Sequence, residues 1–315
     1  MVEKTDPEEN ERTSYPVWPR ILAMFASFAL VAIVFTAVAL LNAPTVSPKP
    51  ELPHIIFILA DDLGWNDVSL HGSPQIPTPN IDALAASGVV LNNYYTHPQC
   101  TPSRGALMSG KYANRVGLHH GDLRPAEASG LPLNVAILPE YMKKRGYKSH
   151  MIGKKNDSLT GDAGNENSIV SPDSEAKISG NVKTLFGIDL WENEEVIRDF
   201  RGEYATNVFT DKALDVIEKH NITKPLFLFV SHAASQTGNK VFHYNRHQNC
   251  MKENHIKETD RRIYAGMVES LDDSVGKIFE ALSQKDMLQK TIIVISSDNG
   301  GAAEPGSSSN WPQRD

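Results

Sequence analysis

The most informative segment for the architecture is His54-Ile55-Ile56-Phe57-Ile58-Leu59-Ala60-Asp61-Asp62. Its apolar residues follow one another without the alternation of a half-buried strand. We therefore expect a strand that is covered on both faces, as in a parallel sheet. The strand ends in two adjacent carboxylates, which repel each other unless a cation lies between them. An isolated Asp-Asp pair can also be a solvated turn.

A second stretch of the same kind lies near the C-terminus. Residues 291–297 are mostly apolar, and Asp298, Asn299 and two glycines follow them. The carboxyl ends of parallel strands meet at one edge of a sheet, where open α/β folds bind ligands, so the two tips can face each other. Oxygen donors without histidine or thiolate select calcium or magnesium over zinc. The candidate metal ligands are Asp61, Asp62, Asp298 and Asn299.

The third informative stretch is Cys100-Thr101-Pro102-Ser103-Arg104. Residues 89–96 before it alternate as a strand would, and His97-Pro98 ends that strand. Pro102 suits the first turn of a helix, which we expect to continue to Met108. A thiol then lies at a helix N-terminus, where free N–H groups and the helix dipole favour an oxyanion, and Arg104 adds a fork of donors. The alternative is that Cys100 is a small buried hydrophobe.

The remaining pattern alternates between helix and strand periodicity, which predicts an α/β fold. Expected helices cover 81–88, 138–146, 211–220 and 262–282, and expected strands cover 147–154 and 225–230. Residues 157–183 are rich in Ser, Gly, Asn, Asp and Glu, which is typical of a mobile loop.

The motif at Cys100, taken with Ser109-Gly110-Lys111-Tyr112, resembles the signature of the type I sulfatases. Other segments are similar to the arylsulfatase B (N-acetylgalactosamine-4-sulfatase) branch of that family: 60–68, 71–73, 78–85 and 93–96. The resemblance implies an alkaline-phosphatase-like α/β/α sandwich with a mainly parallel sheet over residues 54–315. It also implies that this catalytic domain is incomplete at its C-terminus, without the antiparallel subdomain that family members carry.

The same resemblance implies a sulfuric ester hydrolase. In the family the cysteine corresponding to Cys100 is converted to formylglycine by the formylglycine-generating enzyme, and its hydrated aldehyde attacks sulfur. Arg104 would hold that residue, and Lys154 would bind the sulfate oxygens. One divalent cation, usually calcium with magnesium possible, would be bound by Asp61, Asp62, Cys100, Asp298 and Asn299. The substrate would be a sulfated small molecule or a glycosaminoglycan such as chondroitin or dermatan sulfate.

Two positions depart from the family pattern. Asn156 and Gln236 stand where family members carry active-site histidines, and His232 lies four residues before Gln236. His232 could replace the missing histidine if the loop is rearranged, although a structural role is the simpler interpretation. Losing one acid–base partner typically costs about 10²–10⁴-fold in rate. The alternative function is therefore a catalytically impaired sulfatase-like protein that binds sulfated glycans.

Composition limits the remaining classes. The 315 residues are 40% hydrophobic with a net charge of −7, which is enough for one large domain and argues against a nucleic-acid partner. The two cysteines, Cys100 and Cys250, exclude a disulfide scaffold. Cys250 is then either buried or paired with another chain.

The N-terminal region indicates in which compartment the catalytic domain lies and how it is attached there. Residues 1–20 are polar and expected to be disordered, and residues 42–53 form a Pro-rich linker. Residues 21–41 carry no charge and are long enough for a bilayer core of about 30 Å, which favours a transmembrane signal-anchor. The catalytic domain would face the lumen of the ER, Golgi or lysosome, or the cell exterior. The alternative is a secreted or lysosomal protein after signal cleavage. The sequons at Asn156 and Asn221 fit either route.

Overall fold

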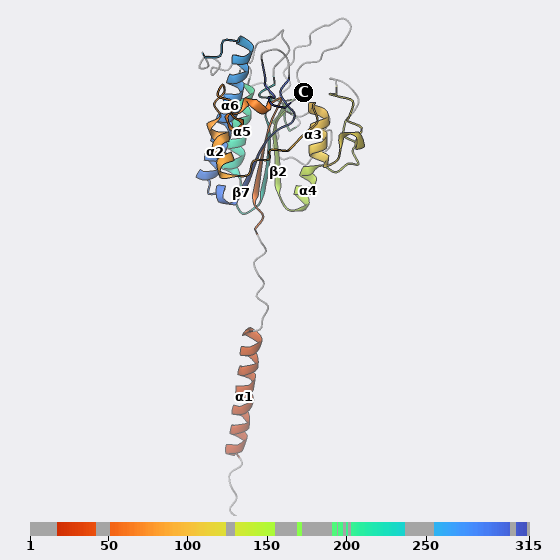
Figure 1. The fold of residues 1–315 in the computed structure, drawn as a ribbon. Coiled ribbons are helices and arrows are strands. Elements are labelled where there is room, and N and C mark those ends of the chain that lie inside the picture. The colour runs from red at the N-terminus through yellow and green to blue at the C-terminus, as the bar shows by residue number, and fades with distance from the viewer. Residues whose placement is uncertain are drawn as a thin grey trace, which may run out of the picture. The chain divides into compact units, whose positions relative to one another are not determined.

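Figure 1 shows the computed structural model, which describes residues 18–41, 51–123, 130–154, 169–171, 191–193, 195–197, 200, 203–236, 255–302 and 307–313. The chain divides into two compact units, Met1–Glu51 and Leu52–Asp315. The described part of the first unit is dominated by one helix, α1 (Trp18–Leu41). Most of the expected disordered segment 1–20 and most of the expected linker lie outside the described residues. The last three residues of that segment are not disordered, because α1 begins at Trp18.

The predicted membrane anchor at 21–41 is not supported. Among the described residues, no helix combines the length and the hydropathy that crossing a membrane requires.

The second unit is built on a seven-stranded sheet with the order β5-β4-β3-β2-β6-β1-β7. The strands are β1 (His54–Ala60), β2 (Lys148–Lys154), β3 (Ile169–Ser171), β4 (Trp191–Glu192), β5 (Glu195–Val196), β6 (Leu226–Ser231) and β7 (Thr291–Ser297). The last five strands in this order, β3, β2, β6, β1 and β7, pair in parallel with their neighbours. Strand β4 pairs antiparallel with both β3 and β5. The prediction of a mainly parallel sheet is therefore confirmed.

Helices cover both faces of the sheet (Figure 1). On one side lie α2 (Pro79–Ser87), α5 (Ala205–Lys219) and α6 (Thr259–Gln284), and on the other lie α3 (Cys100–Ser109) and α4 (Leu138–Lys144). Short 3-10 helices cover Trp65–Asp67, Ser69–His71, Ala113–Arg115 and Leu288–Lys290. The layers form the α/β/α sandwich that the sequence predicts.

The continuous apolar runs of the central strands supply both faces of the core. Ile58 and Val230 pack in one buried cluster with residues of α5 and α6. Leu59 follows Ile58, and Phe229 precedes Val230. Both belong to the second buried cluster, beside α3 and α4. Successive side chains of a strand point to opposite faces, so a strand between two helical layers must be apolar throughout.

Three expectations about secondary structure are wrong. The segment 157–183 is not all loop, because Ile169–Ser171 forms β3 within it. Residues 89–96 form no strand in the structure, and Val89, Leu91 and Tyr95 are 87%, 65% and 73% exposed. Their alternating pattern resembles a strand, but no neighbouring strand among the described residues pairs with this segment. The helix expected at 211–220 begins earlier, because α5 already starts at Ala205.

Candidate active site

The tips of β1 and β7 lie side by side. The two strands pair in parallel with Ala60 opposite Ser297, so the residues that follow each strand leave the sheet together. The backbone N–H of Asp298 donates to the carbonyl of Ala60 at 3.1 Å, and the N–H of Asp62 donates to Asp298 Oδ1 at 3.2 Å. Two acidic segments far apart in the sequence thus meet at the carboxyl edge of the sheet, as expected from the parallel pairing.

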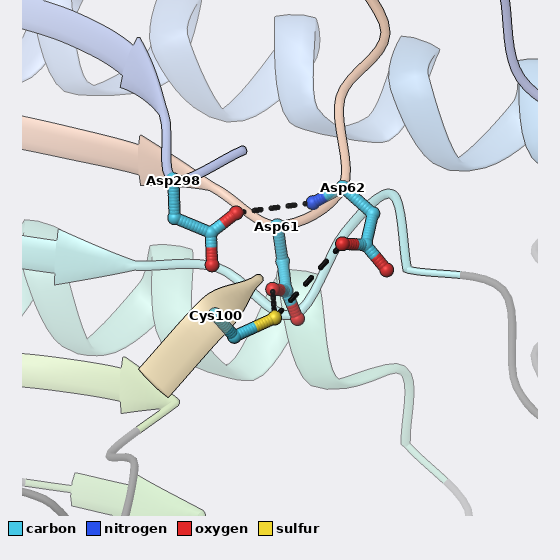
Figure 2. A group of neighbouring side chains, drawn as sticks. All are labelled: Asp61, Asp62, Cys100 and Asp298. Carbon is cyan, nitrogen blue, oxygen red and sulfur yellow. Dashed lines mark hydrogen bonds between the residues drawn. The ribbon is translucent and has the colours of Figure 1, made fainter. Parts of the chain in front are cut away.

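Cys100 faces these carboxylates from the first position of α3 (Figure 2). Its thiol donates to Asp61 Oδ1 at 3.4 Å and to Asp62 Oδ1 at 3.9 Å. One ligand atom from each of Asp61, Asp62, Cys100 and Asp298 lies within 4.8 Å of all the others. We call these four residues the acidic cluster.

The thiol of Cys100 is a poor nucleophile in this setting. Burial raises its pKa well above the ordinary range, and the negative charge of Asp61 raises it further. Lys154 opposes this effect without cancelling it. Because the thiolate is the reactive form of cysteine, the unmodified side chain is protonated and inert near neutral pH.

Arg104 ties three strand tips together from the second turn of α3. Its Nε donates to Asp298 Oδ2 at 2.7 Å, its Nη2 to Asp61 Oδ1 at 3.1 Å, and its Nη1 to Ser231 Oγ at 2.5 Å. These partners follow β7, follow β1 and end β6, respectively. Burial alone would lower the pKa of the guanidinium, but Asp61 and Asp298 hold it above its ordinary value. The sequence predicts that the donors of Arg104 bind an oxyanion. In the structure they bind two carboxylates and a hydroxyl instead.

Lys154 reaches the acidic cluster from the last position of β2. Its Nζ donates to Asp61 Oδ2 at 2.7 Å and to Gln236 Oε1 at 3.0 Å, and it lies 4.0 Å from Cys100 Sγ. Only 2% of the residue is exposed. Lys154 is therefore a buried residue of the site and not a surface lysine at a strand end.

The charges of the site are unbalanced. Among the described residues, the three carboxylates of the acidic cluster face the two cations Arg104 and Lys154, which leaves one excess negative charge when all five groups are ionised. Burial would raise the pKa of Asp61, but Arg104 and Lys154 lower it overall. Burial and the charge of Asp61 raise the pKa of Asp62 to about 6. Burial also raises the pKa of Asp298, to about 7, against the opposing effect of Arg104.

The residues present fit a hard divalent cation. The side-chain oxygen of Asn299 is buried and has no hydrogen-bond partner among the described residues. Its amide nitrogen donates to Asp62 Oδ1 at 2.5 Å, so this oxygen lies next to the acidic cluster. An unsatisfied buried acceptor costs about 1–3 kcal/mol, which coordination of a cation would recover. Carboxylate and amide oxygens are the donors that calcium and magnesium take in proteins.

His232 does not reach the acidic cluster. Its Nε2 lies 3.0 Å from Ser274 Oγ on α6, and burial lowers its pKa to about 4. The structural interpretation of this histidine therefore holds, and it does not replace a histidine at position 236. Gln236 itself contacts Lys154. Asn156 and Cys250 lie outside the described residues.

Sequence reasoning missed the residues that support the acidic turn. Tyr264, which the sequence places on the apolar face of α6, donates from its hydroxyl to Asp67 Oδ2 at 2.8 Å and to the carbonyl of Asp62 at 3.3 Å. Arg261 pairs with Asp67 Oδ1 at 2.6 Å. The sequence signals this network only by a tyrosine within an amphipathic helix, and many helices carry a tyrosine there without supporting a site.

A cavity of about 900 Å³ adjoins the site between α3 and β7. Its lining includes Ser103 and Asp298, apolar residues such as Leu59 and Leu107, and several aromatic and basic side chains: Tyr94, Tyr95, His97, Lys111, Tyr112 and Arg115. Neither Cys100 nor Lys154 is among its lining residues, so the cavity adjoins the acidic cluster without enclosing it.

The chain is similar to known sulfatases over the whole second unit. The family model described as Sulfatase matches residues 53–315. Arylsulfatase J of Mus musculus is 38% identical over 277 residues, which is 83% of this chain and 45% of that protein. N-acetylgalactosamine-6-sulfatase of Homo sapiens is 29% identical over 279 residues, 81% of this chain and 51% of that protein. The crystal structure of Ps i-CgsB matches with a TM-score of 0.72 and 29% identity, over 83% of this chain and 61% of that one.

These comparisons confirm the predicted fold and family, while the closer likeness to the arylsulfatase B branch remains a prediction. The chain spans about half the length of the curated relatives it matches. With a matching family model over 53–315 and its acidic cluster at the carboxyl edge of a parallel sheet, the chain belongs to the sulfatase family.

Proposed function

We propose that the second unit hydrolyses sulfate esters, with Cys100 converted to formylglycine by the formylglycine-generating enzyme. The observation that carries this proposal is the convergence of Asp61, Asp62, Cys100 and Asp298 within 4.8 Å, with Lys154 beside them. The raised pKa of Cys100 supports conversion, because a protonated thiol among carboxylates has no nucleophilic role of its own. The hydrated aldehyde supplies the hydroxyl nucleophile that the thiol lacks.

One calcium ion, with magnesium as the alternative, would be held by Asp61, Asp62, Asp298, Asn299 and the modified Cys100. When bound, such a cation neutralises the carboxylates and polarises sulfate oxygens. Its two positive charges turn the excess negative charge of the site into an excess positive charge. A site of that sign matches the single negative charge of a sulfate monoester.

The chain's own cations then have separate roles. Lys154 donates to the sulfate oxygens, where its charge offsets the charge that develops as the ester bond breaks. Arg104 holds Asp61 and Asp298 at the distances needed by the residue at position 100. Arg104 is a positioning residue, because each of its three nitrogens already donates to a protein group.

Sulfated glycans are the proposed substrate class, with smaller sulfate esters as the alternative. One relative is named for N-acetylgalactosamine 6-sulfate, and one similar structure is a complex with k-i-k-neocarrahexaose. We further propose a lysosomal or secreted location. Asn221 lies exposed in a turn, where its side chain accepts from the N–H of Thr223 at 3.1 Å. A mobility shift on glycosidase treatment, lost in Asn221→Gln, tests this location.

The function is tested with protein co-expressed with the formylglycine-generating enzyme. Mass spectrometry of the peptide containing Cys100 measures conversion, and release of 4-methylumbelliferone from its sulfate measures turnover. We expect turnover in proportion to conversion and none in Cys100→Ala. Fully converted protein without turnover, but with affinity for chondroitin sulfate, would instead identify the catalytically impaired glycan-binding protein.

A further inference from the structure

The loop after β6 is attached to the tip of β1. The N–H of Asp61 donates to the carbonyl of Ala234 at 2.9 Å, and the N–H of Ser235 donates to the carbonyl of Asp61 at 2.8 Å. The N–H of Gln236 closes a turn onto the carbonyl of Ala233 at 3.0 Å. The backbone of Gln236 is therefore fixed relative to Asp61, which belongs to the acidic cluster.

This attachment places Gln236 on one side of the Lys154 ammonium and Asp61 on another. Lys154 Nζ lies 2.7 Å from Asp61 Oδ2 and 3.0 Å from Gln236 Oε1. The guanidinium of Arg104 also lies 3.4 Å from the carbonyl of Lys154, so the backbone below the ammonium is held as well. Lysine has a flexible four-carbon stem, so each acceptor that its ammonium bonds restricts the rotation of that stem. The Gln236 oxygen adds such a restriction to the one from Asp61.

The neutral character of the second acceptor matters. A carboxylate at position 236 would compensate the Lys154 charge and weaken its attraction for a sulfate oxygen. An amide oxygen accepts the hydrogen bond and adds no net charge. The ammonium also keeps its positive charge 4.0 Å from Cys100 Sγ. Sγ is the atom that conversion to formylglycine replaces, so this charge lies beside the position of the nucleophile.

We propose that Gln236 is a positioning residue that orients the ammonium of Lys154 toward position 100 without neutralising it. This inference rests on the proposed function, because it assigns Gln236 to the same site. The inference accounts for the neutral side chain of Gln236 at a position where the family pattern predicts an acid–base group. The amide of Gln236 acts through Lys154 and does not itself transfer a proton.

A double-mutant cycle tests the coupling. Hydrogen bonds to charged groups contribute about 1.5–3 kcal/mol, so Gln236→Leu should lower kcat/KM about 10- to 100-fold. In a Lys154→Met background the same substitution should change kcat/KM less than about twofold, because the group it acts through is gone. Equal losses in both backgrounds would overturn the proposal. Gln284→Leu, on the exposed end of α6, is the matched control and should leave the rate unchanged.

The second measurement needs no turnover. A lysine ammonium gives a resolved ¹H–¹⁵N signal only while hydrogen bonds slow its exchange with water. We expect such a signal in the wild type, assigned by its loss in Lys154→Met. It should be kept in Gln236→Glu and Gln284→Leu and lost in Gln236→Leu, with circular dichroism unchanged in all variants. If converted protein shows no turnover, the proposed function fails while this signal still tests positioning. An undisturbed signal in Gln236→Leu contradicts the inference.

Discussion

At the scale of single residues, Arg104 makes contacts that the motif around it does not predict. The spacing from Cys100 predicts a guanidinium one turn into a helix, and the structure has it there. Its partners Asp61, Asp298 and Ser231 come from three strands, and their neighbourhood depends on strand order. No local pattern encodes that order, so the sequence could predict the residue but not its contacts.

Removing the guanidinium should destabilise the fold strongly. Arg104→Met leaves the buried carboxylates of Asp61 and Asp298 without this partner, and breaking a buried ion pair costs about 3–5 kcal/mol. Urea unfolding of the chelated protein measures the loss. Lys219→Met removes an exposed pair with Asp215 and should leave the free energy of unfolding nearly unchanged, because water screens such pairs. Comparable losses in the two variants would contradict this account of Arg104.

Asn299 offers a direct test of the cation ligands. Because its buried oxygen has no protein partner among the described residues, Asn299→Ala should weaken calcium binding at least about tenfold. Isothermal titration calorimetry of chelator-stripped protein measures the affinity. Asn221→Ala changes an exposed asparagine outside the acidic cluster and serves as the control. Wild-type affinity in Asn299→Ala would remove this oxygen from the ligand set.

At the scale of elements, continuous apolar runs were reliable and alternating ones were not. Both strands that end in acidic tips, β1 and β7, have the predicted bounds. Burial on both faces explains this for β1 only. β7 is the last described strand of the sheet, and its Ile292 is 51% exposed. The alternating segment 89–96 fails, since alternation alone does not reveal whether a partner strand is present. The early start of α5 was hidden by Thr206 and Val208, whose β-branched side chains lower helix propensity.

The end of β2 depends on a residue without a side chain. Gly153 has φ +109°, and a Cβ there would lie 1.8 Å from the carbonyl oxygen of Ser231. Gly146 also has a positive φ, +89°, but its Cβ would meet nothing within 4 Å. We expect Gly146→Ala to cost about 1–2 kcal/mol and Gly153→Ala clearly more, since β2 must also shift and carry Lys154 with it. Equal costs in urea unfolding would show that the close approach of the two strands is not important.

The packing of β6 against α6 should make stability depend on pH through His232. Burial lowers its pKa to about 4, from an ordinary value of 6.5, so the folded state favours the neutral ring. Its contribution is complete above pH 6.5 and is lost as pH falls through 6.5 to 4, by about 3 kcal/mol in all. His232→Gln removes this titration, so its free energy of unfolding should fall less steeply over that range. Parallel curves for variant and wild type would contradict the assignment.

For the whole molecule, the site is assembled from segments spread over most of the second unit. Asp61 and Cys100 come early in the chain, Lys154 and Gln236 from its middle, and Asp298 from its end. The family motifs predict the acidic residues and Cys100, because each of these residues lies in a short sequence motif that identifies it. The contact between Lys154 and Gln236 could not be predicted, since it depends on where the loop after β6 lies relative to the end of β2.

The measurement that tests the central claim most directly is the rate of sulfate ester hydrolysis at controlled free calcium, using protein with fully converted Cys100. Among the described residues, the buried carboxylates of Asp61 and Asp298 and the partly exposed carboxylate of Asp62 face two cations. The site therefore needs a further positive charge before it admits an anionic ester. We predict that chelation abolishes hydrolysis, that calcium restores it with a single saturating dependence, and that this dependence shifts to higher calcium in Asn299→Ala. An unchanged rate in fully chelated protein would contradict the account.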